Sequence, residues 1–184
     1  YEPGSVFKTI TMAAAIESGQ VTPETTYTDL GEVKFGPDVI RNAKNKKYGL
    51  VNMTQILENS INTGIIFAAL KIGHEQFKNF VEKFGFGKRT GILLPHESYG
   101  NLNSLKNKKD IYTATAAYGQ GITVTPLQMV MSYAAIVNDG ILMRPQIIKE
   151  KIYPGGRQET FIPEEVGRVI SSKTANIIKA MLVS

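Results

Sequence analysis

The stretch Tyr1-Glu2-Pro3-Gly4-Ser5-Val6-Phe7-Lys8 opens the chain and carries its most informative pair of side chains. The Pro-Gly pair indicates a turn that starts a helix, and Ser5 and Lys8 follow it three residues apart, so they share one helix face. A serine hydroxyl becomes a nucleophile when a neighbouring base takes its proton, and a lysine among apolar side chains can lose its charge and act as that base. The two apolar residues between them and Ile10 supply such surroundings. The pattern predicts a nucleophile beside free backbone N–H groups that could help hold an oxyanion.

A second motif is needed, because one Ser-x-x-Lys arises by chance in roughly every chain of this length. The stretch Glu58-Asn59-Ser60-Ile61-Asn62 supplies Ser60-x-Asn62. A second hydroxyl can relay a proton, and an amide can hold Lys8 or a substrate carbonyl by hydrogen bonds. The ordinary alternative is a serine that caps a helix and an asparagine in a loop.

Together these motifs resemble the transpeptidase domain of class B penicillin-binding proteins, and the resemblance extends over nearly the whole chain. Further segments similar to that family follow in the same order. They are Phe84-Gly85-Phe86-Gly87 with Thr90-Gly91-Ile92-Leu93-Leu94-Pro95, then Tyr118-Gly119-Gln120-Gly121, then Val124-Thr125-Pro126-Leu127-Gln128.

The family's third motif, Lys-Thr/Ser-Gly on an active-site strand, does not occur in this sequence. Lys88-Arg89-Thr90-Gly91 has one residue too many between Lys and Thr, and it follows a glycine-rich stretch instead of a strand pattern. We interpret it as a loop. The resemblance therefore implies a piece of a longer enzyme, residues 1–184 being the helical part of a partial transpeptidase domain.

Composition indicates one globular core. The chain has 184 residues, of which 42% are hydrophobic and 20% charged, so it is neither disordered nor strongly polar. The absence of cysteine excludes disulfides and thiolate metal sites, and His74 and His96 lack a metal-ligand spacing, so we expect no metal and no cofactor. Much of the net charge of +5 lies in residues 44–47 and 106–109. We interpret these runs as solvated loops and expect no nucleic-acid partner.

Apolar periodicity and end signals predict a mostly helical chain. The first helix, ending near Gly19, is apolar nearly all round, which is typical of a buried helix. Residues 21–50 are expected to form a loop with one or two short strands, and residues 141–153 a strand pair or extended arm. Helices are expected at about residues 5–17, 54–60, 63–72, 75–84, 111–118, 127–138, 163–171 and 173–183. Together with this helical pattern, the resemblance implies the fold class: a mostly α fragment of an α/β (α+β) serine transpeptidase or β-lactamase-like fold, with the antiparallel sheet largely outside this chain.

The resemblance implies a peptidoglycan D,D-transpeptidase that β-lactams inhibit. It implies Ser5 as nucleophile, Lys8 as base and Ser60 as proton relay, with Asn62, Gln120 and Tyr118 binding substrate. The alternative for Tyr118 is a core position beside a tight glycine turn. It also implies stem peptides and β-lactams as ligands, division or elongation proteins as partners, and a place on the extracytoplasmic face of the bacterial inner membrane, anchored by a segment outside this chain.

Two other functions remain open from the sequence. A serine β-lactamase or D,D-carboxypeptidase shares both motifs, but it needs a base that activates water, and no carboxylate for that role is identifiable in the sequence. A non-catalytic β-lactam sensor or scaffold module is the alternative of another class. A sensor would be acylated without turnover, whereas a scaffold would tolerate the loss of Ser5.

Overall fold

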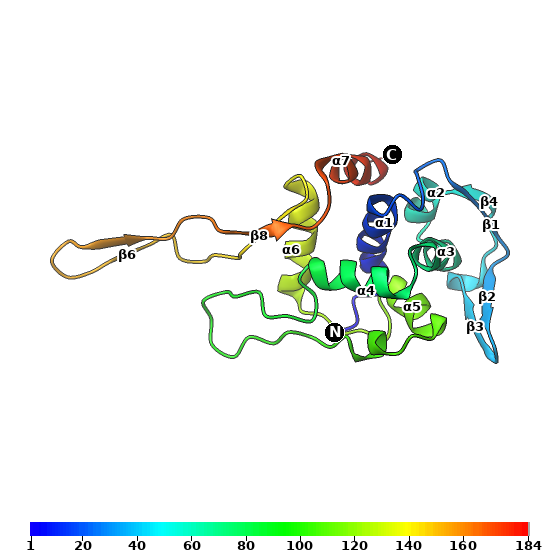
Figure 1. Ribbon diagram of the computed structural model, residues 1–184, viewed down its shortest axis with the longest axis horizontal. Coiled ribbons are helices and arrows are strands. Elements are labelled where there is room, and N and C mark those ends of the chain that lie inside the picture. The colour runs from blue at the N-terminus through cyan, green and yellow to red at the C-terminus, as the bar shows by residue number, and fades with distance from the viewer. Residues whose placement is uncertain (184) are drawn as a thin grey trace.

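One buried helix forms the centre of the molecule. The computed structural model describes residues 1–183, and in it the 3₁₀ turn η1 (Gly4–Phe7) runs into α1 (Lys8–Glu17), drawn in blue in Figure 1. Every α1 residue from Lys8 to Ile16 is buried, because small or apolar side chains occupy nearly all sides of the helix. At its end, Gly19 N–H donates to Ile16 O at 3.0 Å and Gln20 N–H to Ala15 O at 3.2 Å, so Gly19 closes the helix as predicted.

Further helices pack around α1 (Figure 1). Two side-chain hydroxyls tie α1 and η1 to this shell: Thr11 Oγ1 donates to Ala117 O at 2.8 Å, and Tyr133 OH donates to Val6 O at 2.8 Å. The shell consists of α2 (Met53–Glu58), α3 (Asn62–Ile72), α4 (His74–Lys83), α5 (Asp110–Ala117), α6 (Pro126–Val137) and α7 (Ser172–Met181), with the 3₁₀ turns η2 (Ala43–Asn45) and η3 (Asn103–Lys106). These six helices lie where the sequence predicted them, within about two residues at each end.

The strands form separate antiparallel pairs, and no sheet within residues 1–183 has more than two strands. In the first pair Asp29 lies opposite Gly49, and in the second Val33 lies opposite Ile40. The pairs are β1 (Thr26–Asp29) with β4 (Gly49–Asn52), β2 (Glu32–Phe35) with β3 (Asp38–Arg41), β5 (Ile141–Met143) with β8 (Glu165–Arg168), and β6 (Glu150–Ile152) with β7 (Gln158–Thr160). The described chain is therefore mainly helical, with strands confined to ribbons.

Two sequence predictions are wrong in this part of the fold. Residues 21–50 contain β1, β2, β3 and the start of β4, which is more than the one or two strands expected. Residues 163–171 contain no helix, because β8 pairs with β5, with Ile141 opposite Arg168. Pro163 followed by acidic residues is a helix-start composition, but pairing with a distant strand overrides that local preference.

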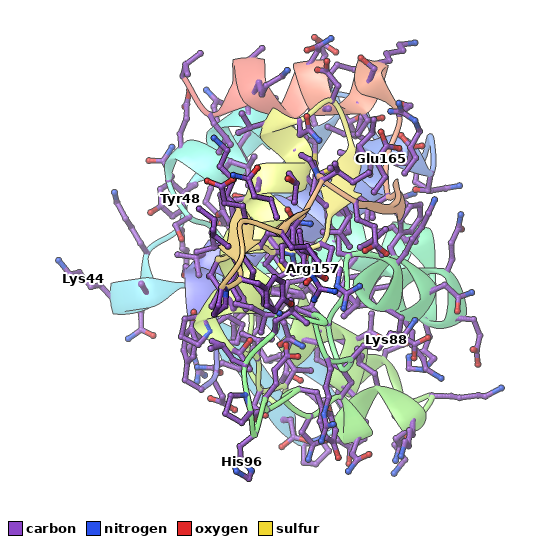
Figure 2. The ribbon with its side chains drawn as sticks, turned by 90° about the vertical axis from the view of Figure 1, so that its left-hand side faces the viewer. Lys44, Tyr48, Lys88, His96, Arg157 and Glu165 are labelled. Atoms are coloured by element: carbon purple, nitrogen blue, oxygen red, sulfur yellow. The ribbon has the colours of Figure 1, made fainter. Side chains whose placement is uncertain are left out.

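The predicted extended arm is present and longer than expected. The β5–β8 pair continues into the β6–β7 hairpin, which projects away from the helices (Figure 1). Figure 2 faces the arm end-on, with Arg157 near its tip, and shows Lys44 projecting from the body into solvent. Residues 44–47 and 106–109 are all exposed, as expected for solvated loops. Among the described residues, no helix has both the length and the apolar character needed to cross a bilayer.

Candidate active site

The turn that carries Ser5 rests on a distant segment of the chain. Gly4 N–H donates to Gly119 O at 2.9 Å, and Gly121 N–H donates to Glu2 Oε1 at 2.9 Å. A Cβ atom on Gly119, whose φ is +77°, would lie 2.6 Å from the Gly4 nitrogen and closer still to its carbonyl oxygen. Only glycine allows the two backbones to approach this closely.

Ser5 is exposed at the start of the helical run, and its hydroxyl has no hydrogen-bond partner within residues 1–183. Lys8 begins α1 one turn later, and no hydrogen bond joins the two side chains in the described part of the chain. Catalytic hydrogen bonds are often long before a substrate binds. The hydroxyl is thus open to an incoming carbonyl, with the lysine on the following turn.

The Lys8 side chain is buried and bonded to both predicted partners. Its Nζ atom lies 2.5 Å from Ser60 O, 3.0 Å from Ser60 Oγ and 2.7 Å from Asn62 Oδ1. Burial, which leaves the residue 2% exposed, lowers the pKa of the Lys8 ammonium from 10.5 to about 8. A neutral amine has two N–H bonds and one lone pair. The two carbonyl oxygens can accept hydrogen bonds from the two N–H groups, which leaves the lone pair free to take a proton from a neighbouring hydroxyl.

Ser60 takes a backbone conformation that glycine usually occupies. Its φ is +53°, its N–H donates to Leu57 O at 3.1 Å, and Ile61 N–H donates to Ile56 O at 2.9 Å. This is the pattern that closes a helix through a left-handed residue, and it costs a non-glycine residue about 1–3 kcal/mol. The N-cap of α3 is Ile61, so Ser60 is not the helix cap that the ordinary reading of the motif required.

Asn62 is held in one orientation. Its Nδ2 atom donates to Arg41 O at 2.9 Å, at the end of β3, and this leaves Oδ1 to accept from Lys8. Because the amide can form both hydrogen bonds only in this orientation, β3 fixes the acceptor that Lys8 contacts.

The structure brings the predicted site residues together. A pocket of about 350 Å³ is lined by Gly4, Ser5, Val39, Ile40, Arg41, Asn62, Tyr118 and Gln120. Lys8 and Ser60 join this pocket through Asn62. Tyr118 is 8% exposed and belongs to the core as well as to the pocket wall, and burial, followed by the charge of Glu2, raises the pKa of its phenol. It therefore stays neutral at physiological pH.

Residues 39–41 are the part of this pocket that the sequence did not predict. Their alternation after Gly36-Pro37 is a hairpin signal that could have placed the strand. Nothing in that signal would have placed the strand beside Ser5, because the contact joins distant parts of the chain.

The segment Lys88-Arg89-Thr90-Gly91 lies outside this pocket, in a loop after α4. Thr90 N–H and Oγ1 donate to Glu97 Oε1 at 2.6 and 2.5 Å, and Gly91 N–H donates to Glu97 Oε2 at 3.2 Å. Lys88 is exposed. The interpretation of this segment as a loop is confirmed. Among residues 1–183, no three His, Cys, Asp or Glu side chains are grouped so that they could hold a metal ion.

This arrangement of Ser5, Lys8, Ser60 and Asn62 occurs in a chain that matches a known protein family. The family model described as the penicillin binding protein transpeptidase domain matches residues 1–184. The chain belongs to the penicillin-binding protein transpeptidase family. The prediction made from the motifs is confirmed, and so is the fold class, because solved transpeptidase domains share this structure.

Relatives match along the whole chain. The penicillin-binding protein PbpB of Mycolicibacterium smegmatis is 37% identical over 100% of this chain and 28% of its own length. Stage V sporulation protein D of Bacillus subtilis is 36% identical over 100% of this chain and 29% of its own. The chain therefore spans less than a third of either relative.

Two solved structures have the same fold as this chain. Penicillin-binding protein 3 of Mycobacterium tuberculosis, in complex with aztreonam, superposes with a TM-score of 0.90 and 33% identity, covering 99% of this chain and 41% of that one. The D,D-transpeptidase domain of a peptidoglycan glycosyltransferase from Eggerthella lenta gives a TM-score of 0.92 with 26% identity, covering 100% and 48%.

Proposed function

We propose that this chain is the helical part of the transpeptidase domain of a longer protein, and that the protein is a peptidoglycan D,D-transpeptidase acylated by β-lactams at Ser5. The observation that carries the proposal is the buried Lys8 amine, bonded to Ser60 and Asn62 beside the pocket that exposes Ser5. The relatives' names support the reaction class, since one from Neisseria flavescens is a probable peptidoglycan D,D-transpeptidase.

In the proposed first step, Ser5 Oγ forms a bond to the carbonyl carbon between two terminal D-alanines. The Ser5 proton passes to Lys8 Nζ, whose lowered pKa provides a neutral fraction: one pH unit below its pKa, about a tenth of a lysine is neutral. The carbon–nitrogen bond then breaks, and Ser60 relays a proton from Lys8 to the departing amine. Asn62 orients Lys8 and the substrate, while Tyr118 and Gln120 form the wall against which the peptide lies.

In the proposed second step, the amine of another stem peptide attacks the Ser5 ester. Its proton passes to Lys8, the ester bond breaks, and Ser5 regains its proton. Backbone N–H groups at the start of η1 supply part of the oxyanion hole, and the strand with the third motif would supply the rest. Removing one such donor typically costs about 10²–10³-fold in rate, so we expect residues 1–184 alone to be a poor catalyst.

The described lining residues of the pocket include no group suited to hydrolysis of the acyl-enzyme. A β-lactamase or carboxypeptidase needs a base that activates water, and none of the described residues that line the pocket carries a carboxylate. The proposal extends to an extracytoplasmic location, where peptidoglycan lies, and to partners in the division or elongation machinery.

Labelling with a fluorescent penicillin tests the proposed function. We expect the full-length protein to acquire one covalent adduct, on Ser5, and Ser5→Ala to acquire none. Mass spectrometry of the labelled peptide locates the adduct. An adduct on another residue, or undiminished labelling of folded Ser5→Ala, overturns the assignment. Labelling without crosslinking of a stem-peptide substrate by the full-length protein would indicate a sensor instead of a transpeptidase.

The lowered pKa of Lys8 predicts a pH profile for acylation. Only the neutral amine can accept the Ser5 proton, so the rate should rise with pH and reach half of its plateau near the Lys8 pKa of about 8. Below that pH it should fall close to tenfold per unit. Stopped-flow measurement of acylation by a penicillin between about pH 6 and about pH 9.5 checks this profile. These limits span the Lys8 pKa by roughly two units. A flat profile over that range contradicts the role of Lys8 as base.

A further inference from the structure

Asp29, at the end of β1, is a buried carboxylate outside the proposed reaction. It is 2% exposed. Its Oδ1 atom accepts from Thr63 Oγ1 at 2.6 Å, Gly31 N–H at 2.9 Å and Asn42 Nδ2 at 3.0 Å. Its Oδ2 atom accepts from Tyr48 N–H at 2.8 Å and Asn42 Nδ2 at 2.9 Å.

The charge of Asp29 is balanced by hydrogen-bond donors. No lysine, arginine or histidine of residues 1–183 forms an ion pair with it. Burial alone would raise the pKa of its carboxyl, but the donated hydrogen bonds, that of Thr63 foremost, outweigh burial and lower it. An ionised carboxylate with these donors fixes the directions of the groups that bond to it.

Asn42 extends this network towards the lysine. Its Oδ1 atom accepts from Thr63 N–H at 3.1 Å, and its own N–H donates to Gly31 O at 3.1 Å. Asn42 directly follows Arg41, whose carbonyl oxygen holds the Asn62 amide, and Thr63 directly follows Asn62. Asn42 and Thr63 are thus the sequence neighbours of the two residues in the Arg41–Asn62 hydrogen bond. Both donate hydrogen bonds to the Asp29 carboxylate.

We propose that Asp29 is a positioning residue for acylation, acting through Asn42 and Thr63 on Asn62 and so on the placement of the Lys8 amine. The inference rests on the proposed function. Asn62 Oδ1 lies 2.7 Å from Lys8 Nζ, and a rotation or shift of the first turn of α3 would change that contact directly. Misplacement of a catalytic group by about 1 Å can cost 10²-fold in rate.

The first test is Asp29→Asn in the full-length protein. An asparagine there would turn its amide group towards donors such as Asn42 Nδ2 or Tyr48 N–H, so the network must rearrange. We expect the rate constant of acylation at saturating penicillin to fall about 10- to 100-fold. The dissociation constant of the preceding non-covalent complex should change by less than about threefold, because Asp29 does not contact the ligand pocket that contains Ser5.

Glu17→Gln is the matched control for loss of stability. Glu17 also accepts several hydrogen bonds at a helix start, from Ser171 N–H at 3.0 Å, Ser171 Oγ at 2.8 Å and Thr174 Oγ1 at 2.5 Å. It lies at the far end of α1 from Lys8. We expect Glu17→Gln to lower the melting temperature without lowering the acylation rate constant of the folded protein.

Thr63 supplies a milder pair of variants that does not depend on Asp29→Asn folding. Thr63→Ser keeps the hydroxyl that donates to Asp29 and should acylate close to the wild-type rate, whereas Thr63→Val removes that donor and should acylate several-fold more slowly. Equal rates for the two variants overturn the inference.

A double-mutant cycle separates positioning from general destabilisation. In an Asn62→Ala background, Asp29→Asn should cost little further rate, because the group it positions is gone. If the two losses add in full, or if folded Asp29→Asn behaves like Glu17→Gln, the inference fails while the proposed function stands. If Asn62→Ala, Lys8→Ala and Ser5→Ala all leave penicillin labelling intact, the proposed function fails, and this inference fails with it.

Discussion

Lys8→Ala should slow the acylation of Ser5 by roughly 10²–10⁴-fold, the usual contribution of general-base assistance. Without the amine, no other described side chain that lines the pocket can take the serine proton at neutral pH. The substitution also leaves Ser60 O and Asn62 Oδ1 without the donor they share in the folded protein. Each unsatisfied group costs about 1–3 kcal/mol, so some loss of stability should accompany the loss of rate.

The measurement is the rate of labelling by a fluorescent penicillin, with circular dichroism to confirm folding. Lys88→Ala is the matched control, because it removes an exposed lysine from the loop that resembles a third motif and should leave the rate unchanged. A Lys8→Ala rate within tenfold of wild type would exclude Lys8 as the base. A comparable loss in Lys88→Ala would mean that the loop belongs to the site.

Gly119→Ala should damage both stability and acylation, because its Cβ would overlap the Gly4 backbone. Gly119 accepts the Gly4 N–H at 2.9 Å, so separating the two segments breaks that hydrogen bond and shifts the turn that carries Ser5. Overpacking costs typically about 1–3 kcal/mol and left-handed backbone about 1–2 kcal/mol more. We expect urea unfolding to show that the free energy of unfolding falls by the sum of these two costs. Acylation should be about 10²-fold slower.

Gly155→Ala is the control for the backbone contribution alone. Gly155 lies in the arm at φ +90°, and a Cβ atom there would meet nothing within 4 Å. The Gly155→Ala variant should lose only the part of the free energy of unfolding that comes from the left-handed backbone. Its acylation rate should stay that of the wild type. If Gly119→Ala is no worse than Gly155→Ala in both measurements, the close approach of residues 4 and 119 does not support the site.

The helices were predictable because their signals are local. Thr125-Pro126 with Gln128 encodes a complete capping box, and in the structure Thr125 Oγ1 accepts from Gln128 N–H at 3.1 Å while Gln128 Oε1 accepts from Thr125 N–H at 2.9 Å. The strand at residues 165–168 was missed because its partner, β5, lies more than twenty residues earlier. The side chains of residues 165–168 are all exposed, so burial left no alternation in the sequence to mark the strand.

The site could be predicted from the sequence where its reactive side chains belong to short motifs. Two short motifs contain Ser5, Lys8, Ser60 and Asn62, and the family resemblance of these motifs was enough to propose that the four side chains meet. Arg41 contributes a backbone carbonyl, which every residue has, so its sequence identity contains no sign of that role. Asp29 gathers donors from four residues, Gly31, Asn42, Tyr48 and Thr63, and only the folded chain brings them together.

The turn that carries the serine is supported from a segment that comes much later in the chain. The main-chain nitrogen of Tyr1 donates to Val124 O at 3.0 Å across 123 residues, and Val124 N–H donates back to Tyr1 O at 2.9 Å. Contacts between such distant residues require closure of a long loop and form slowly. A ribosome makes Ser5 more than a hundred residues before it makes residues 119–124. The nascent chain should therefore carry its nucleophile in an unreactive form, protected from premature acylation until the later segment has been made and has paired with the turn.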